Sequence, residues 1–231
     1  MNNDIRREDA AGGLIRTVLL WGSLWGIFES TVGYLLHLLP VSLGWLVWYP
    51  VACFFMAMTY ERARRPAAIL CVGLLAACIK LLDLFLPVRI DMVLNPAVSI
   101  VFEALAMFCV VSAVGRLGEE RRKKPLVIKA LAVISMNTGW RVLYILYLLL
   151  LVPDWMREIS VISSARQLTR HLVVGNLATS ALIYPACLYL DRLLGLINKI
   201  SVFRLPEQGS ALKKLAVPCL LALNILLQIL L

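Results

Sequence analysis

Charged and polar side chains recur inside long apolar stretches of this chain, where their placement costs energy. A charged side chain at the centre of a bilayer costs about 2.5–3.5 kcal/mol on insertion scales, so such residues face the interior of a helix bundle and pair there. Acids and bases gathered in one place can bind a polar or zwitterionic solute, because the cations take its anionic group and the acids its cationic group. The candidate solute-binding residues are Glu29, His37, Lys80, Asp83, Asn95, Glu103, Asn137, Arg141 and Asn176.

Spacing places several of these residues on shared helix faces. Lys80 and Asp83 are three residues apart, which permits an ion pair within one helix. Asn95, Ser99 and Glu103 recur every four residues, so they follow one side of a helix. Each set predicts a polar face that is turned toward the interior of a bundle.

The same residues could instead hold the bundle together. Polar side chains inside membranes often serve as contacts between helices, worth about 0.6 kcal/mol per hydrogen bond. Lys80–Asp83, Glu103–Arg141 or Glu29–Arg141 would then be structural pairs. The number of charges favours a ligand or ion site over purely structural pairing, because it exceeds what packing requires.

No familiar catalytic or metal-binding motif accompanies these residues. The sequence lacks H-E-x-x-H, a Walker A loop, G-x-S-x-G and a dinucleotide fingerprint. His37 and His171 are the only histidines, which argues against a histidine-rich metal centre, and His171 is expected at the membrane interface. All six cysteines fall in apolar segments without C-x-x-C spacing, which favours packing over zinc or redox chemistry. The sequence therefore assigns no catalytic residue, no metal ligand and no cofactor.

Composition and the length of the apolar runs define the elements that carry these residues. Of 231 residues 61% are hydrophobic and 16% charged, against roughly 45–50% and about 25% in soluble domains. A membrane-spanning helix needs about 20 consecutive apolar residues, and lipid offers no partner to unpaired backbone groups. We therefore predict an all-α, polytopic transmembrane helical bundle of six or seven spans, which forms a single integral membrane domain over residues 1–231. The predicted spans are 14–39, 43–60, 67–86, 93–115, 126–152, 171–194 and 213–231.

Basic residues indicate the side of the membrane on which each loop lies. Most Lys and Arg fall before the first span, near residues 62–65 and 116–129, and after the sixth span, all on the side of the N-terminus. By the positive-inside rule the N-terminus is cytoplasmic, and the expected location is the cytoplasmic membrane of a prokaryote. The net charge of +9 then reflects topology and contact with an anionic lipid bilayer, and nucleic acid explains it poorly.

This orientation places the polar residues in the middle and outer half of the bundle, which predicts a polar pocket toward the outer side. The segment 153–170 is expected to form a helix in the outer interface. Four aromatic residues near the predicted outer ends are expected to anchor the bundle there: Trp45, Trp48, Tyr49 and Trp155.

Small residues recur on one face of the first predicted span, at Gly22, Gly26 and Ser30, as in helices that pack closely. With the basic inner side, the outward polar pocket and the lack of a nucleotide motif, this pattern over residues 14–194 resembles the substrate-binding S-components of energy-coupling factor transporters. The resemblance implies capture of a solute such as a vitamin near the outer side. It also implies docking of a membrane partner subunit through Gly22, Gly26 and Ser30. The seventh predicted span departs from the six helices of that family.

The main functional hypothesis is solute uptake, either by the chain itself or as the substrate-binding membrane subunit of a transporter. Without an ATP-binding motif, accumulation of the solute would need an ion gradient or a separate ATPase. One alternative is a membrane-embedded enzyme acting on a lipid or amphiphile, with Glu29 or Glu103 as acid or base and Lys80 or Arg141 holding the head group. The other alternative is a structural subunit of a membrane complex.

Overall fold

In the computed structural model the described residues form helices and turns without strands, which confirms the all-α part of the predicted fold class. The structure describes residues 12–29, 44–87, 89–117, 125–189, 218–220 and 222–223. The long helices are residues 12–29, α2 (Gly44–Ala63), α3 (Ala67–Leu81), α4 (Asp91–Gly115), α6 (Pro125–Leu150) and α9 (Asn176–Leu188). The shorter ones are the 3₁₀ turn η1 (Leu82–Phe85), α7 (Asp154–Glu158), α8 (Ala165–Thr169) and the π-helical segment η2 (Arg170–Gly175).

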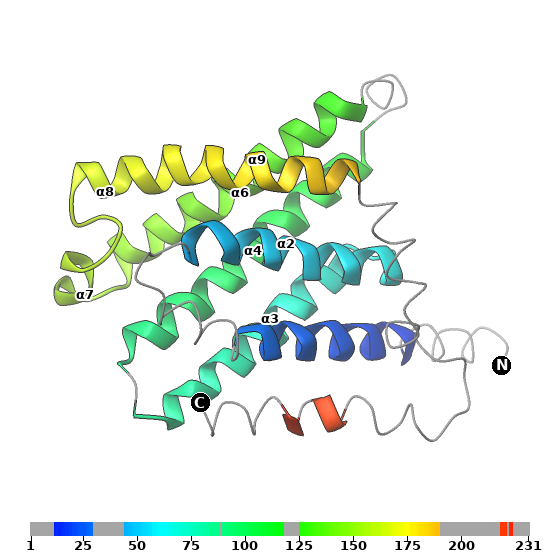
Figure 1. Ribbon diagram of the computed structural model, residues 1–231, viewed down its shortest axis with the longest axis horizontal. Coiled ribbons are helices and arrows are strands. Elements are labelled where there is room, and N and C mark those ends of the chain that lie inside the picture. Colours follow the sequence, from blue (N-terminus) through cyan, green and yellow to red (C-terminus); the bar gives the residue numbers. More distant parts are fainter. Residues whose placement is uncertain are drawn as a thin grey trace, which may run out of the picture.

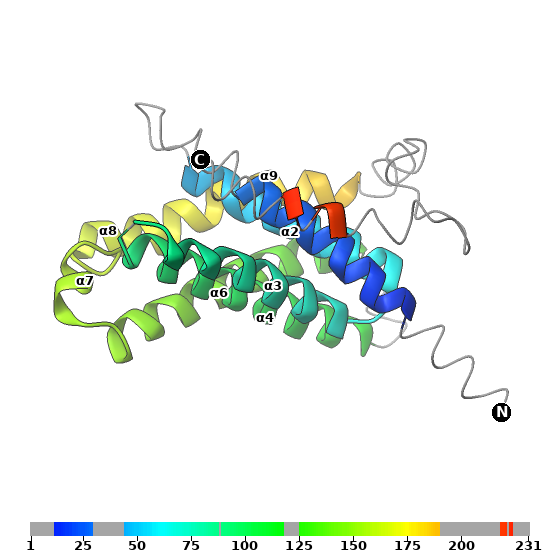
Figure 2. The same cartoon turned by 90° about the horizontal axis from the view of Figure 1, so that it is seen from below.

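The helices form two layers that cross obliquely (Figures 1 and 2). The helix of residues 12–29, α2 and α9 lie in one layer, and α3, α4 and α6 lie in the other. Within the second layer α4 packs against both α3 and α6, while α2 contacts helices of both layers. Successive long helices run in opposite directions. One end of the bundle, at the left in Figure 1, therefore collects the end of α6 and the starts of α2, α4 and α8, and we call it the distal end.

Among the described residues, four helices are long and apolar enough to cross a membrane: Ala67–Phe85, Asp91–Gly115, Pro125–Leu150 and Ala165–Leu188. They correspond to the predicted spans 67–86, 93–115, 126–152 and 171–194. Their length and composition indicate a multi-pass membrane protein. The predicted span 43–60 forms α2, whose tryptophans and tyrosines make it less apolar than these four. The predicted spans 14–39 and 213–231 lie partly outside the described residues.

Large apolar side chains cover the outer faces of the candidate spans. Leu74, Leu131, Ile134, Leu146 and Leu177 are each about half exposed or more. A water-soluble protein would place charged and polar groups on such surfaces, whereas lipid solvates apolar ones. The outward faces therefore suit contact with a bilayer.

Two helix boundaries differ from the sequence prediction for local reasons. The sixth span begins at Ala165 instead of residue 171, because the Ser164 side chain caps the helix by accepting a hydrogen bond from the Gln167 backbone N–H at 3.2 Å. Within segment 153–170, only Asp154–Glu158 forms a separate helix, with Trp155 half exposed. The α2 helix ends at Ala63, where Arg64 adopts a left-handed backbone with φ of 52°.

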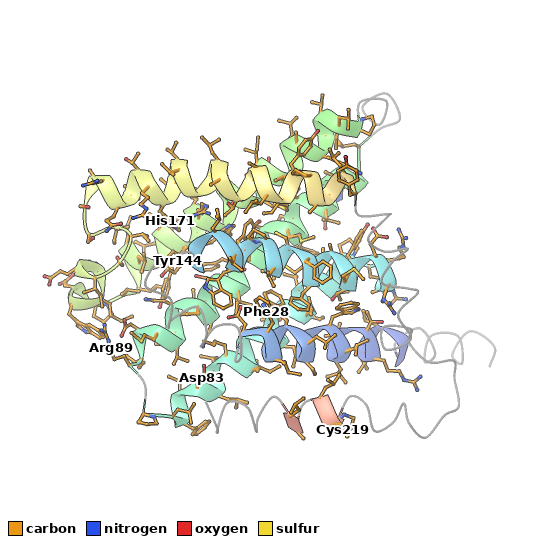
Figure 3. The ribbon with its side chains drawn as sticks, viewed as in Figure 1. Phe28, Asp83, Arg89, Tyr144, His171 and Cys219 are labelled. Carbon is orange, nitrogen blue, oxygen red and sulfur yellow. The ribbon has the colours of Figure 1, made fainter. Side chains whose placement is uncertain are left out.

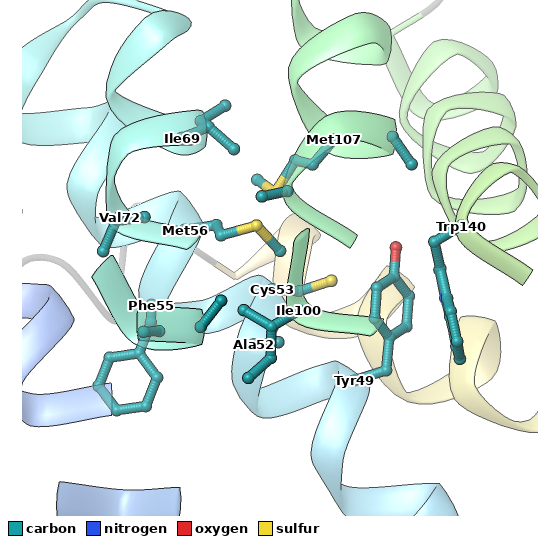
Figure 4. Close-up of a cluster of buried hydrophobic side chains, with 14 of the residues drawn as sticks. Tyr49, Ala52, Cys53, Phe55, Met56, Ile69, Val72, Ile100, Met107 and Trp140 are labelled. Atoms are coloured by element: carbon teal, nitrogen blue, oxygen red, sulfur yellow. The ribbon is translucent and has the colours of Figure 1, made fainter. Parts of the chain in front are cut away.

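An apolar core joins α2 to α3, α4 and α6 (Figure 4). Met56 of α2 and Val72 of α3 are fully buried there, and Ile100 of α4 is nearly so. The backbones of α3 and α4 approach closely at Gly73, where an added Cβ would collide with the Cβ of Ala104. This packing fixes the rotation of each helix and thereby decides which polar side chains meet.

Candidate functional site

Asn137 lies at the centre of a polar network between α6 and α9. Its side chain is fully buried, and its Nδ2 lies 2.9 Å from the backbone oxygen of Asn176. The same amide nitrogen lies 2.7 Å from Thr179 Oγ1 and 2.8 Å from Ser180 Oγ. Its Oδ1 accepts a hydrogen bond from Trp140 Nε1 at 3.1 Å. One amide side chain thus bridges two of the candidate membrane-spanning helices.

Arg141 follows one turn later on α6 and is 3% exposed. Its Nε donates to Asn137 Oδ1 at 3.1 Å, its Nη1 to the His171 backbone oxygen at 2.9 Å, and its Nη2 to Thr179 Oγ1 at 3.2 Å. The guanidinium also lies over the ring of Trp140, 4.6 Å from the centroid. Each of these partners is neutral, and the ion pairs in the described part of the chain do not include Arg141. The network therefore holds a buried cation without a carboxylate in contact.

The π-helical segment η2 makes room for this guanidinium. A π-turn widens the helix locally, and such segments occur frequently at functional sites. Gly175 ends the segment, and a Cβ there would lie 2.9 Å from Arg141 Nη1 and 3.3 Å from Cζ. Glycine is the residue type that leaves this space, so Gly175 belongs to the site although it offers no side chain.

His171 completes the network from within η2. Its Nδ1 lies 3.3 Å from Arg141 Nη1, and its ring packs edge-on against Trp140 at 5.5 Å and beside Tyr144 at 6.0 Å. Figure 3 shows the His171 and Tyr144 side chains close together toward the distal end. Arginine can only donate, so Nδ1 accepts and the ring proton is on Nε2. That Nε2 is buried and has no hydrogen-bond partner among the described residues.

A second polar group lies between the helix of residues 12–29 and α3. Lys80 Nζ is 2.7 Å from Asp83 Oδ2, which confirms the ion pair expected from their spacing. Glu29 accepts a hydrogen bond from Trp25 Nε1 at 3.2 Å and interacts electrostatically with both members of that pair. Glu103 of α4 is 6% exposed and interacts electrostatically with Glu29 on one side and Arg141 on the other.

The candidate residues from the sequence therefore fall into two linked groups. One contains Asn137, Arg141 and Asn176, and the other contains Glu29, Lys80 and Asp83, with Glu103 between them. Neither Glu103–Arg141 nor Glu29–Arg141 occurs among the ion pairs of the described residues, so Glu103 acts on Arg141 at longer range. Asn95 stands apart, with a buried Oδ1 that has no hydrogen-bond partner in the described part of the chain. His37 lies outside the described residues, and a binding role for any of these residues stays a prediction.

Two residues of the network were assigned elsewhere by sequence reasoning. His171 was expected at the interface, and Tyr49 was expected to anchor the bundle there. Tyr49 is instead 1% exposed and packs against Trp140 with ring centroids 5.2 Å apart, so the anchoring prediction is wrong for it. The available signal for His171 was its position five residues before Asn176. In the structure η2 places His171 against Arg141, whereas the backbone oxygen of Asn176 lies against Asn137.

The small-residue face of the first helix packs inside this chain. Gly22 and Gly26 are buried, and a Cβ on Gly22 would lie 2.5 Å from Leu75 Cδ2 of α3. Ser30 lies outside the described residues. The close helix approach expected for this face is present, with α3 as the neighbour.

Comparison of the chain with protein-family models, curated proteins and solved structures found no match.

Proposed function

We propose that the chain is a multi-pass protein of a prokaryotic cytoplasmic membrane that binds a polar solute for uptake. It would work either with an ion gradient or as the substrate-binding subunit of a larger transporter, as in the S-components that its sequence pattern resembles. The observation that carries the proposal is Arg141, a cation buried in an apolar bundle whose direct partners are all neutral.

A purely structural arginine would be expected to contact a carboxylate. Burying a charge without a counter-ion costs several kcal/mol, on the order of 3–5 kcal/mol when one partner of a buried pair is removed. Here four neutral contacts orient the guanidinium. They do not neutralise its positive charge, which can therefore pair with an anionic ligand. Such pre-organisation favours a ligand, because the protein has already ordered the groups that the ligand meets.

The depth of the network supports access from outside. We propose that the N-terminus is inside and that the chain crosses the membrane six or seven times, which puts the distal end at the outer surface. Arg141 lies in the second half of α6, toward the distal end, and His171 lies near the start of the helix Ala165–Leu188. A partner subunit that energises uptake would dock elsewhere than on Gly22 and Gly26, since both are buried within this chain.

The test is ligand-induced stabilisation of the purified protein. The melting temperature is recorded in detergent against a library of vitamins, amino acids and other polar solutes, for the wild type and for Arg141→Met. The matched control is Arg89→Met, which removes an exposed arginine that pairs with Asp91 near the distal end.

We expect at least one solute to raise the melting temperature by several degrees in the wild type and in Arg89→Met but not in Arg141→Met. An unchanged shift in a folded Arg141→Met protein would refute the role of Arg141. No shift with any solute, together with co-purifying membrane proteins, would favour a structural subunit instead.

A further inference from the structure

We propose that the solute of this site carries a carboxylate, which Arg141 and the Nε2–H of His171 bind together. This inference rests on the proposed function and names the chemistry of its ligand. The inference rests on two hydrogen-bond donors without acceptors among the described residues, in two residues that contact each other.

The first donor belongs to Arg141. A guanidinium has five N–H groups, and the hydrogen bonds of Arg141 engage Nε once, Nη1 twice and Nη2 once. One N–H of Nη2 therefore has no acceptor among the described residues. The positive charge of the same group also has no carboxylate in contact there.

The second donor is the Nε2–H of His171. The contact of Nδ1 with Arg141 at 3.3 Å fixes the neutral tautomer that carries its proton on Nε2. This atom is buried without a partner in the described part of the chain. A buried donor that lacks an acceptor is costly, so the site gains from any group that supplies one.

One planar anion with two oxygens can accept hydrogen bonds from both donors. A carboxylate offers one oxygen to the guanidinium and the other to the imidazole, and its single charge matches the single cation of the network. A phosphate dianion would call for a second cation, but Lys80 is already paired with Asp83. The chemistry of the donors therefore selects a monocarboxylate over a phosphate.

A carboxylate could come from a soluble solute or from the head group of phosphatidylserine. Arg141 and Asn137 are buried between α6 and α9, whereas the faces turned toward lipid carry apolar side chains. We therefore assign the carboxylate to a soluble solute.

The experiment is nitrogen-15 NMR of the protein labelled at histidine, in phosphatidylcholine nanodiscs. The chain has two histidines, so His37→Gln assigns the resonances of His171. Formate and acetate are titrated, with chloride and inorganic phosphate as controls at matched ionic strength. We expect His171 to be protonated at Nε2 and its Nε2–H resonance to shift saturably with formate and acetate, at least tenfold more weakly in Arg141→Met.

Two variants of the histidine separate donor from packing. His171→Gln keeps an N–H donor near the Nε2 position, so formate should still raise the melting temperature of this variant. The melting temperature of His171→Leu should not respond to formate. Equal loss in both variants would overturn the role of the Nε2–H.

Other outcomes would overturn the inference in distinguishable ways. A shift equal to that with chloride, or no saturable shift with either carboxylate, means that water alone satisfies these donors. Tighter binding of phosphate would exclude the monocarboxylate class. A shift produced by phosphatidylserine nanodiscs without added anion would assign the site to lipid. If an uncharged solute stabilises the wild type but not Arg141→Met while formate leaves His171 unmoved, the carboxylate fails and the proposed function stands.

Discussion

In this bundle a single buried polar side chain makes several hydrogen-bonding contacts between helices. The amide of Asn137 contacts five other polar groups, three of them on α9. Because lipid offers no competing hydrogen bonds, each donor or acceptor released inside the bundle stays unsatisfied. The consequences of altering this residue should therefore exceed the loss of a single contact.

Asn137→Leu should lower the free energy of unfolding by about 2–6 kcal/mol, since Trp140 Nε1 and Arg141 Nε both lose their acceptor, at about 1–3 kcal/mol each. Unfolding is measured in bicelles by steric trapping. The control is Asn95→Leu, whose Oδ1 has no partner among the described residues to lose. Equal destabilisation by both substitutions would contradict the role of Asn137 as a bridge.

The Lys80–Asp83 ion pair should contribute much less to stability than the Asn137 network. Both side chains remain partly accessible, at 18% and 16%, and they are neighbours on one helix. A double-mutant cycle with Lys80→Met and Asp83→Asn should give a coupling energy of about 0.3–1 kcal/mol. A coupling above about 2 kcal/mol would show that the pair is more deeply desolvated than its exposure indicates.

Among the helices, Ala165–Leu188 contributes to the polar network through three different local structures. Its first turn is capped by Ser164, its π-helical segment η2 places His171, and its regular part α9 supplies Thr179 and Ser180 to the network. The carbonyl of His171 accepts from Arg141. The π-turn and the arginine therefore depend on each other.

Gly175→Ala tests this dependence. A methyl group there would lie 2.9 Å from Arg141 Nη1, so the guanidinium must move. We expect a loss of about 1–3 kcal/mol from overpacking, which outweighs the roughly 0.8–1 kcal/mol that alanine gains over glycine in a helix. Gly139→Ala is the matched control on α6, where the new methyl group would meet the Cβ of Ala106 at an ordinary 3.4 Å. Thermal unfolding should show a lower melting temperature for Gly175→Ala alone.

Across the whole bundle, the antiparallel order of the helices and the distribution of charge are consistent with the proposed orientation. The turn between α2 and α3 carries basic residues near Arg64, while the distal turns carry Asp83, Asp91 and Asp154 (Figure 3 labels Asp83). If the basic side faces inward, as proposed, the distal end and with it the polar network lie toward the outside.

Cysteine labelling in intact cells checks this orientation. In a variant without the six native cysteines, Asp154→Cys should react with a membrane-impermeant maleimide, and Arg64→Cys should react only after permeabilisation. Both native side chains are well exposed, at 89% and 72%, so accessibility within the protein does not limit either reaction. Labelling of Arg64→Cys in intact cells would reverse the proposed topology.

The sequence by itself determined the features that depend on local physics. Apolar run length and the need to pair every backbone group in lipid predicted the all-α class and the helices matching 67–86, 93–115 and 126–152 within a few residues. Helical spacing alone predicted the Lys80–Asp83 pair. It also placed Asn95, Ser99 and Glu103 on one face, although it did not show what that face meets.

Only the tertiary structure decided which polar groups meet. Arg141 contacts Asn137, His171 and Thr179 because the packing of α6 on α9 fixes their relative rotation, and that rotation depends on contacts distant in sequence. The π-turn shifts His171 away from its regular helical position, so periodicity could not bring it to the site. Gly22 likewise faces α3 because helices of this chain fill the space that a partner subunit was expected to occupy. Local composition selects the elements, whereas long-range packing sets the distances of a few ångströms on which binding chemistry depends.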